Sequence, residues 1–113
     1  MLHSMVEIFH LTCGWGRVVH KKMSRKNFDP KVWGPPAWRF IEFVVASYPD
    51  EVTEYDQGWM TEFLVAIAEA LPCESCRDNY ATWMSLKPLD RYIGTRESVT
   101  EWLAGYKVWA RSK

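Results

Sequence analysis

Two cysteines three residues apart, Cys73 and Cys76, are the residues of this chain best suited to chemistry. They belong to the segment 71–77, Leu-Pro-Cys-Glu-Ser-Cys-Arg, which the pattern places at the start of a helix. One helical turn brings two such sulfurs close enough to form a disulfide. Free backbone N–H groups and the positive end of the helix dipole stabilise a thiolate there, and Arg77 adds a cation. The pair therefore predicts a redox-active dithiol.

A zinc site is the alternative for the same pair, because cysteines at this spacing also form half of a tetrahedral site. The other donors would have to be Cys13 and one of His3, His10 and His20. None of these stands at a recognisable ligand spacing, so we expect no metal site. The chain has three cysteines. This odd number fits one working pair and one single thiol better than a disulfide scaffold.

Composition limits the classes of function. The chain has 113 residues, of which 48% are apolar, enough for one domain with one core. The net charge is zero, so no overall field favours nucleic acid. No apolar run approaches the ~20 residues that a membrane span needs. Residues 1–16 also lack the early basic region of a signal peptide. We therefore expect a soluble protein that binds neither nucleic acid nor a membrane.

The chain divides into an extension and a domain. Residues 1–28 contain all three histidines and more basic than acidic side chains. We predict that they form a basic, partly flexible N-terminal extension, with a short helix near residues 2–11. Residues 29–113 are predicted to form the domain.

From Asp29 onward the apolar spacing is helical, and no segment alternates as a strand does. The pattern predicts helices over residues 36–48, 53–70, 73–86 and 96–109. Cys76 shares a helix face with Tyr80 and Trp83, so this cysteine is expected to point toward aromatic side chains. Helices of this length with short links predict an all-α four-helix bundle.

Four motifs carry a family resemblance. They are Trp-Gly-Pro-Pro-Ala-Trp at 33–38, Ala-Ser-Tyr-Pro-Asp at 46–50, the cysteine segment at 71–77, and Thr-Arg-Glu at 95–97 followed by Trp-Leu at 102–103. Together they resemble the Erv/Alr family of FAD-linked sulfhydryl oxidases, over about residues 29–109. The resemblance implies a four-helix bundle with a short fifth helix, often assembled as a homodimer.

The resemblance also implies an activity. Such an enzyme binds FAD against the two cysteines, takes two electrons from a protein dithiol and delivers them to oxygen as hydrogen peroxide. By position, Cys73 would be the exposed sulfur that exchanges with substrate, and Cys76 would lie next to the flavin. A chain this small resembles a viral or other minimal member. This implies a virus-encoded protein of the host cytoplasm or virion, with the mitochondrial intermembrane space as the alternative.

The sequence departs from the family pattern at the cofactor site. Glu42 stands where the family normally has a histidine, and we expect it either to pair with Arg39, Lys107 or Arg111 or to reach solvent. The family's His-Asn-x-Val-Asn motif is replaced by a stretch that includes Tyr106 and Lys107. The residues expected to contact FAD are Gly34, Trp38, Glu42, Tyr106, Lys107 and Arg111. The alternative function is a flavin-free family member that acts in structure, assembly or dithiol exchange.

Overall fold

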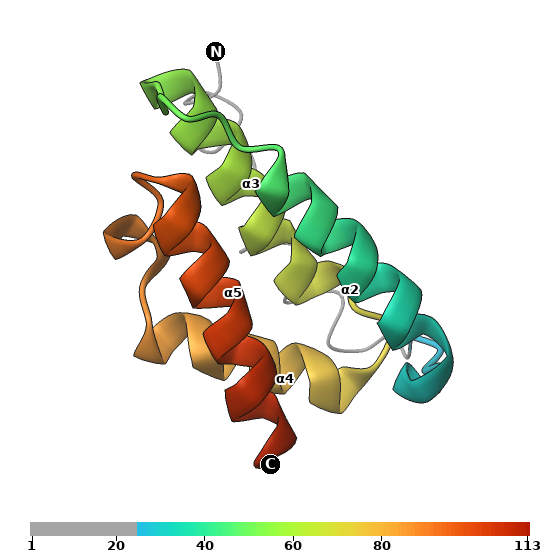
Figure 1. The fold of residues 1–113 in the computed structure, drawn as a ribbon. Helices are drawn as coiled ribbons and strands as arrows, with labels where there is room; N and C mark the ends of the chain where they lie inside the picture. Colours follow the sequence, from blue (N-terminus) through green and yellow to red (C-terminus); the bar gives the residue numbers. More distant parts are fainter. Residues whose placement is uncertain (1–24) are drawn as a thin grey trace.

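The computed structural model describes residues 25–113 as a set of α-helices (Figure 1). The elements are α2 (Pro30–Ala46), α3 (Glu54–Ala70), α4 (Glu74–Leu86), a one-turn 3-10 helix (Leu89–Arg91) and α5 (Arg96–Arg111). No strand occurs in this part of the chain, which confirms the all-α, four-helix fold. The short helix predicted near residues 2–11 lies outside the described residues. Among residues 25–113, no helix is both long and apolar enough to cross a bilayer.

Helix α4 connects the bundle, because it packs on both α3 and α5, while α2 packs on α5. Figure 1 shows α4 lying crosswise to α3 and α5. The predicted apolar faces meet in the core between them. Its fully buried side chains are Val45, Tyr48, Met60, Leu64, Tyr80, Val99 and Trp102. On α3 the innermost positions are Met60 and Leu64, whereas Trp59 and Phe63 are half-buried.

The start of α2 differs from the prediction. The pattern placed it at residue 36, but the helix begins at Pro30 and contains Pro35 and Pro36. Two helix-start signals compete here, one at Asp29–Pro30 and one at Pro35–Pro36. The helix begins at the earlier one because it has both a capping side chain and a proline in the first turn. The Asp29 side chain accepts a hydrogen bond from the Lys31 amide at 2.9 Å, and Pro30 occupies the first turn, where proline fits. The helix therefore carries six more residues that can contribute to a site.

Helices α3 and α5 begin directly after residues whose side chains cap them. Thr53 and Asp56 form a reciprocal capping box at the start of α3, and Thr95 caps α5. Between helices, the Tyr80 hydroxyl donates to the Leu64 carbonyl at 2.6 Å. Burial raises the pKa of Tyr80 well above its usual range, so this phenol stays neutral and keeps donating. This bond fixes α4 against α3.

Candidate redox site

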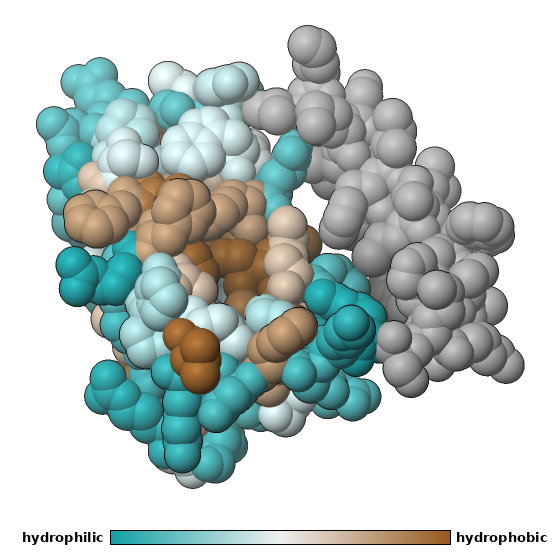
Figure 2. All heavy atoms as spheres, turned by 90° about the vertical axis from the view of Figure 1, so that its right-hand side faces the viewer, coloured by the Kyte–Doolittle hydropathy of each residue, from teal (hydrophilic) through white to brown (hydrophobic). Residues whose placement is uncertain are grey.

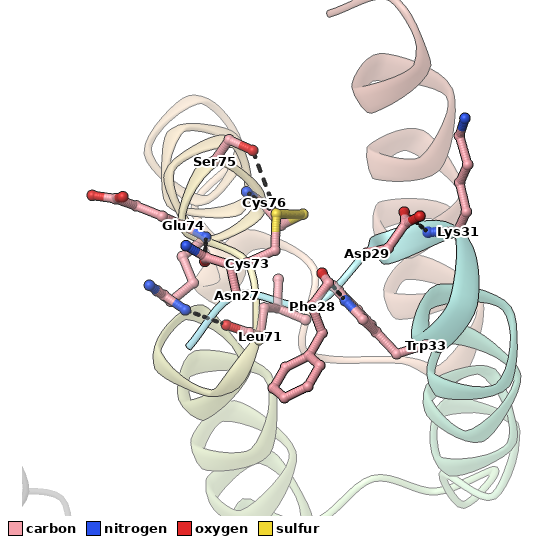
Figure 3. The surroundings of a disulfide bond; sticks show 11 residues. Asn27, Phe28, Asp29, Lys31, Trp33, Leu71, Cys73, Glu74, Ser75 and Cys76 are labelled. Atoms are coloured by element: carbon pink, nitrogen blue, oxygen red, sulfur yellow. Dashed lines mark hydrogen bonds between the residues drawn. A yellow bond between two sulfur atoms is a disulfide. The ribbon is translucent and has the colours of Figure 1, made fainter. Parts of the chain in front are cut away.

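Cys73 and Cys76 lie at the first turn of α4 and are joined in a disulfide (Figure 3). Cys73 is the N-cap residue, and its sulfur accepts a hydrogen bond from the Cys76 amide at 3.3 Å. The predicted position at a helix N-terminus is therefore confirmed. The helix end offers its unpaired amides and its positive dipole to this sulfur, which favours the thiolate after reduction.

The two sulfurs differ in exposure, in the opposite sense to the prediction. The side chain of Cys73 is only 8% exposed, whereas Cys76 is half-buried. Cys73 is therefore the less exposed cysteine in this structure, and its exchange with substrate stays a prediction. Residues 25–28, which the sequence assigned to the extension, lie against the loop that carries Cys73 (Figure 3).

Arg77 holds this loop in shape. Its guanidinium donates to the Leu71 carbonyl at 2.5 Å, across the Pro72 that separates α3 from α4. The expected cation is thus near the dithiol and also fixes the backbone that precedes it. The third cysteine, Cys13, and the three histidines lie outside the described residues, and so does most of the predicted extension.

A cleft of about 800 Å³ opens beside Cys76, between α2, α4 and α5. All six residues that the sequence singled out for cofactor contact line it: Gly34, Trp38, Glu42, Tyr106, Lys107 and Arg111. Lys31 and Asn79 also line the cleft, and the sequence reasoning missed both. Helical spacing was an available signal for Asn79, which lies one turn after Cys76, but not for Lys31, which precedes the predicted helix start at residue 36.

Aromatic rings form the deep wall of the cleft. The rings of Trp38 and Tyr106 lie 5.4 Å apart between centroids, at 40° to each other. Tyr80 packs behind both of them. Burial raises the pKa of the Tyr106 phenol, which keeps it protonated and able to donate a hydrogen bond. This wall offers two tilted aromatic rings with one polar edge.

Charged side chains surround the aromatic wall. Glu42 pairs with Lys107, one of the three partners that the sequence allowed. Lys31, Arg39 and Arg111 add three further cations to the lining, so positive charge exceeds negative there. Such a rim suits an anionic group, above all a phosphate, which arginine and lysine bind through charge-assisted hydrogen bonds.

Gly34 leaves space in the cleft. It is buried in α2, and a Cβ atom at this position would lie 3.9 Å from Cδ1 of Trp38, the nearest side-chain atom. A larger side chain here would extend over Trp38 into the cleft. The aromatic wall, the cationic rim and this gap together fit a large planar ligand with an anionic tail, held beside Cys76.

Comparisons with known proteins agree with this geometry. Residues 35–107 match the model of the Erv1 / Alr family. The mitochondrial FAD-linked sulfhydryl oxidase erv1 of Schizosaccharomyces pombe is 30% identical over 70 residues, which cover 62% of this chain and 38% of that protein. FAD-linked sulfhydryl oxidase ERV1 of Arabidopsis thaliana is 24% identical over 70 residues, covering 62% and 36%. Mitochondrial FAD-linked sulfhydryl oxidase ERV1 of Saccharomyces cerevisiae is 25% identical over 75 residues, covering 66% and 39%. The match thus spans well under half the length of these relatives.

Proposed function

The chain belongs to the Erv1/Alr family, and from this premise we propose that it is an FAD-dependent thiol oxidase. It would form disulfides in protein substrates and pass the electrons to oxygen, giving hydrogen peroxide. One observation carries the proposal: the Cys73–Cys76 disulfide stands at the edge of an aromatic, cation-rimmed cleft, and Cys76 lines that cleft. A dithiol that only stabilised the fold would need no such cleft beside it.

The residues of the cleft fit FAD. Trp38 and Tyr106 offer a surface for the flavin ring, and Gly34 leaves room beside Trp38. Lys31 and Arg111 suit the diphosphate. When bound, FAD supplies the transfer of electrons from the dithiol to oxygen, and the protein supplies position and electrostatics.

The dithiol chemistry is carried by the chain's own residues. A substrate thiolate attacks one sulfur of the Cys73–Cys76 disulfide, which breaks, and the other sulfur leaves as a thiolate. A second substrate thiol then attacks the mixed disulfide. The substrate leaves oxidised by two electrons, and both cysteines are left reduced. The start of α4 stabilises the thiolates that form in these steps.

The second candidate is a flavin-free member of the family that exchanges dithiols or serves in assembly. The ion pair between Glu42 and Lys107 favours it, since these residues satisfy each other without a ligand. Oxygen uptake driven by dithiothreitol separates the two functions. An oxidase consumes one oxygen and forms one peroxide for each dithiol, whereas a dithiol-exchange protein consumes none.

Two relatives are named mitochondrial, which favours the mitochondrial alternative for this chain over the viral one.

The surface of α2 favours a particular oligomeric state. Helix α2 exposes two aromatic side chains on one face, Phe40 at 61% and Phe43 at 67%. Figure 2, which views the side on which α2 lies, shows apolar residues gathered in a band. Exposed apolar patches of this kind favour protein interfaces, and we propose a homodimer through this face of α2.

Phe43→Glu is expected to convert this dimer into a monomer, because each copy would bury a charge at the interface. Light scattering after size-exclusion chromatography gives the mass. Glu51→Gln is the matched control, since Glu51 is exposed and lies outside α2, and it should leave the dimer intact. A wild-type protein that is monomeric at about 100 μM would contradict the proposal.

A further inference from the structure

Residues 25–28 form an extended strap that is bonded to the loop carrying Cys73. The Phe28 amide donates to the Pro72 carbonyl at 2.8 Å. The Asn27 side chain accepts a hydrogen bond from the Glu74 amide, also at 2.8 Å. The Arg25 guanidinium donates to the carbonyl of Glu69 at 2.5 Å. The strap is thus held at positions on both sides of Cys73.

The strap and the burial of Cys73 coincide. Cys73 lies between Pro72 and Glu74, two of the three residues whose backbone groups the strap engages, and it is 8% exposed. Figure 3 shows Asn27 and Phe28 running alongside Leu71 and Cys73. The side chains of the strap are exposed, so the strap is a thin outer layer. It is held to the loop by the Phe28 backbone amide and by the side chains of Asn27 and Arg25.

The groups that the strap satisfies are those that any extended peptide could use. The Pro72 carbonyl accepts from a backbone N–H, which every residue but proline supplies. The Glu74 amide is one of the first donors of α4, which have no partner inside the helix. A short side chain with an oxygen acceptor, such as that of Asn27, can accept the hydrogen bond of the Glu74 amide. The loop therefore presents groups that an extended segment with one such side chain can bind.

We propose that the strap occupies, within the same molecule, the surface of residues 69–74 on which an extended segment of a protein substrate docks to reach Cys73. The proposal rests on the proposed function and adds to it how the substrate binds. Once the strap is displaced, the substrate thiolate attacks the Cys73 sulfur, the bond to Cys76 breaks, and Cys76 leaves as the thiolate on the side of the cleft. The strap thus restrains reaction at Cys73 until a polypeptide takes its place.

The test measures how fast Cys73 reacts when the strap is weakened. In full-length protein carrying Cys13→Ser and Cys76→Ser, Cys73 is the one remaining thiol. Its reaction with 2,2′-dithiodipyridine is followed by the release of thiopyridone. Arg25→Ala combined with Asn27→Ala removes two of the hydrogen bonds that hold the strap, and the rate should rise by roughly three- to tenfold. Lys26→Ala is the matched control and should change nothing, since Lys26 has no hydrogen bond or ion pair to the described residues.

A second arm tests the docking site itself. A synthetic peptide with the sequence of residues 24–30, Ser-Arg-Lys-Asn-Phe-Asp-Pro, should return the rate of the weakened variant toward that of the parent. The same peptide with alanine in place of asparagine should do so less well. Equal rates in parent and weakened variant would overturn the strap, and a peptide without effect would overturn the docking site. Circular dichroism verifies that each variant is folded.

These rates require neither flavin nor oxygen. If the strap is confirmed but dithiothreitol drives no oxygen uptake, the proposed oxidase fails while the docking site stands. If oxygen uptake is normal and the rates are equal, the oxidase stands and the strap fails.

Discussion

Serine in place of either Cys73 or Cys76 is expected to reduce dithiothreitol-driven oxygen uptake to background. In the proposed oxidase, each cycle would form and break the bond between these two sulfurs, and a hydroxyl cannot replace a sulfur in that bond. Loss of a covalent nucleophile typically costs roughly a thousandfold or more in turnover. An oxygen electrode measures the rate, with the FAD content of each variant determined from its absorbance.

The matched control is Cys13→Ser, which removes the remaining cysteine of the chain and leaves the disulfide intact. This variant should keep its oxygen uptake with dithiothreitol, because a small thiol reaches the disulfide directly. If Cys73→Ser or Cys76→Ser kept wild-type turnover while retaining FAD, the assignment of the working pair would be wrong.

Gly34→Leu is expected to weaken FAD binding strongly without unfolding the protein. Gly34 lines the cleft and faces Trp38, so a leucine side chain would fill space that the flavin ring needs. Overpacking of this kind costs about 1–3 kcal/mol, which corresponds to roughly 10- to 100-fold weaker binding. Fluorescence titration with FAD gives the dissociation constant, and thermal unfolding shows whether α2 is preserved.

Gly34→Ala is the control for this substitution. A Cβ atom at Gly34 meets its nearest neighbour at 3.9 Å, an ordinary van der Waals distance. Alanine in a helix interior is favoured over glycine by about 0.5–1 kcal/mol, so this variant should bind FAD and melt slightly higher. Unchanged FAD affinity in Gly34→Leu would show that the ligand binds elsewhere.

The parts of the fold that depend on local signals could be predicted from the sequence. Thr53, Cys73 and Thr95 each cap the helix that follows, and the predicted starts there agree with the structure within one residue. The predicted start of α2 was wrong because two helix-start signals, one at Pro30 and one at Pro35, compete in the sequence. Only the completeness of the cap at Asp29 decides between them.

The predicted residues of the cleft came from the family resemblance. Gly34, Trp38 and Glu42 recur at every fourth residue of α2 and so share one face, but the helix predicted from the spacing began at residue 36 and did not include Gly34. The sequence offered three cations as partners of Glu42 and could not decide between them. Glu42 and Lys107 are 65 residues apart, so their ion pair depends on how α2 and α5 pack.

The burial of Cys73 could not be predicted. It accompanies hydrogen bonds between the strap and a loop that lies far along the chain, with 47 residues separating Asn27 from Glu74. No periodic pattern marks residues 25–28, and their basic composition suggested an extension instead. Contacts of extended backbone leave little trace in the sequence, because almost any residue can make them.

The measurement that tests the central proposal most directly is an absorbance spectrum of the purified full-length protein after incubation with FAD and removal of the excess. The spectrum is recorded before and after anaerobic dithiothreitol, and again after air is admitted. We expect flavin bands that bleach with the thiol and return with oxygen. A protein that stays colourless, or whose bound flavin does not respond to the thiol, would contradict an FAD-dependent thiol oxidase.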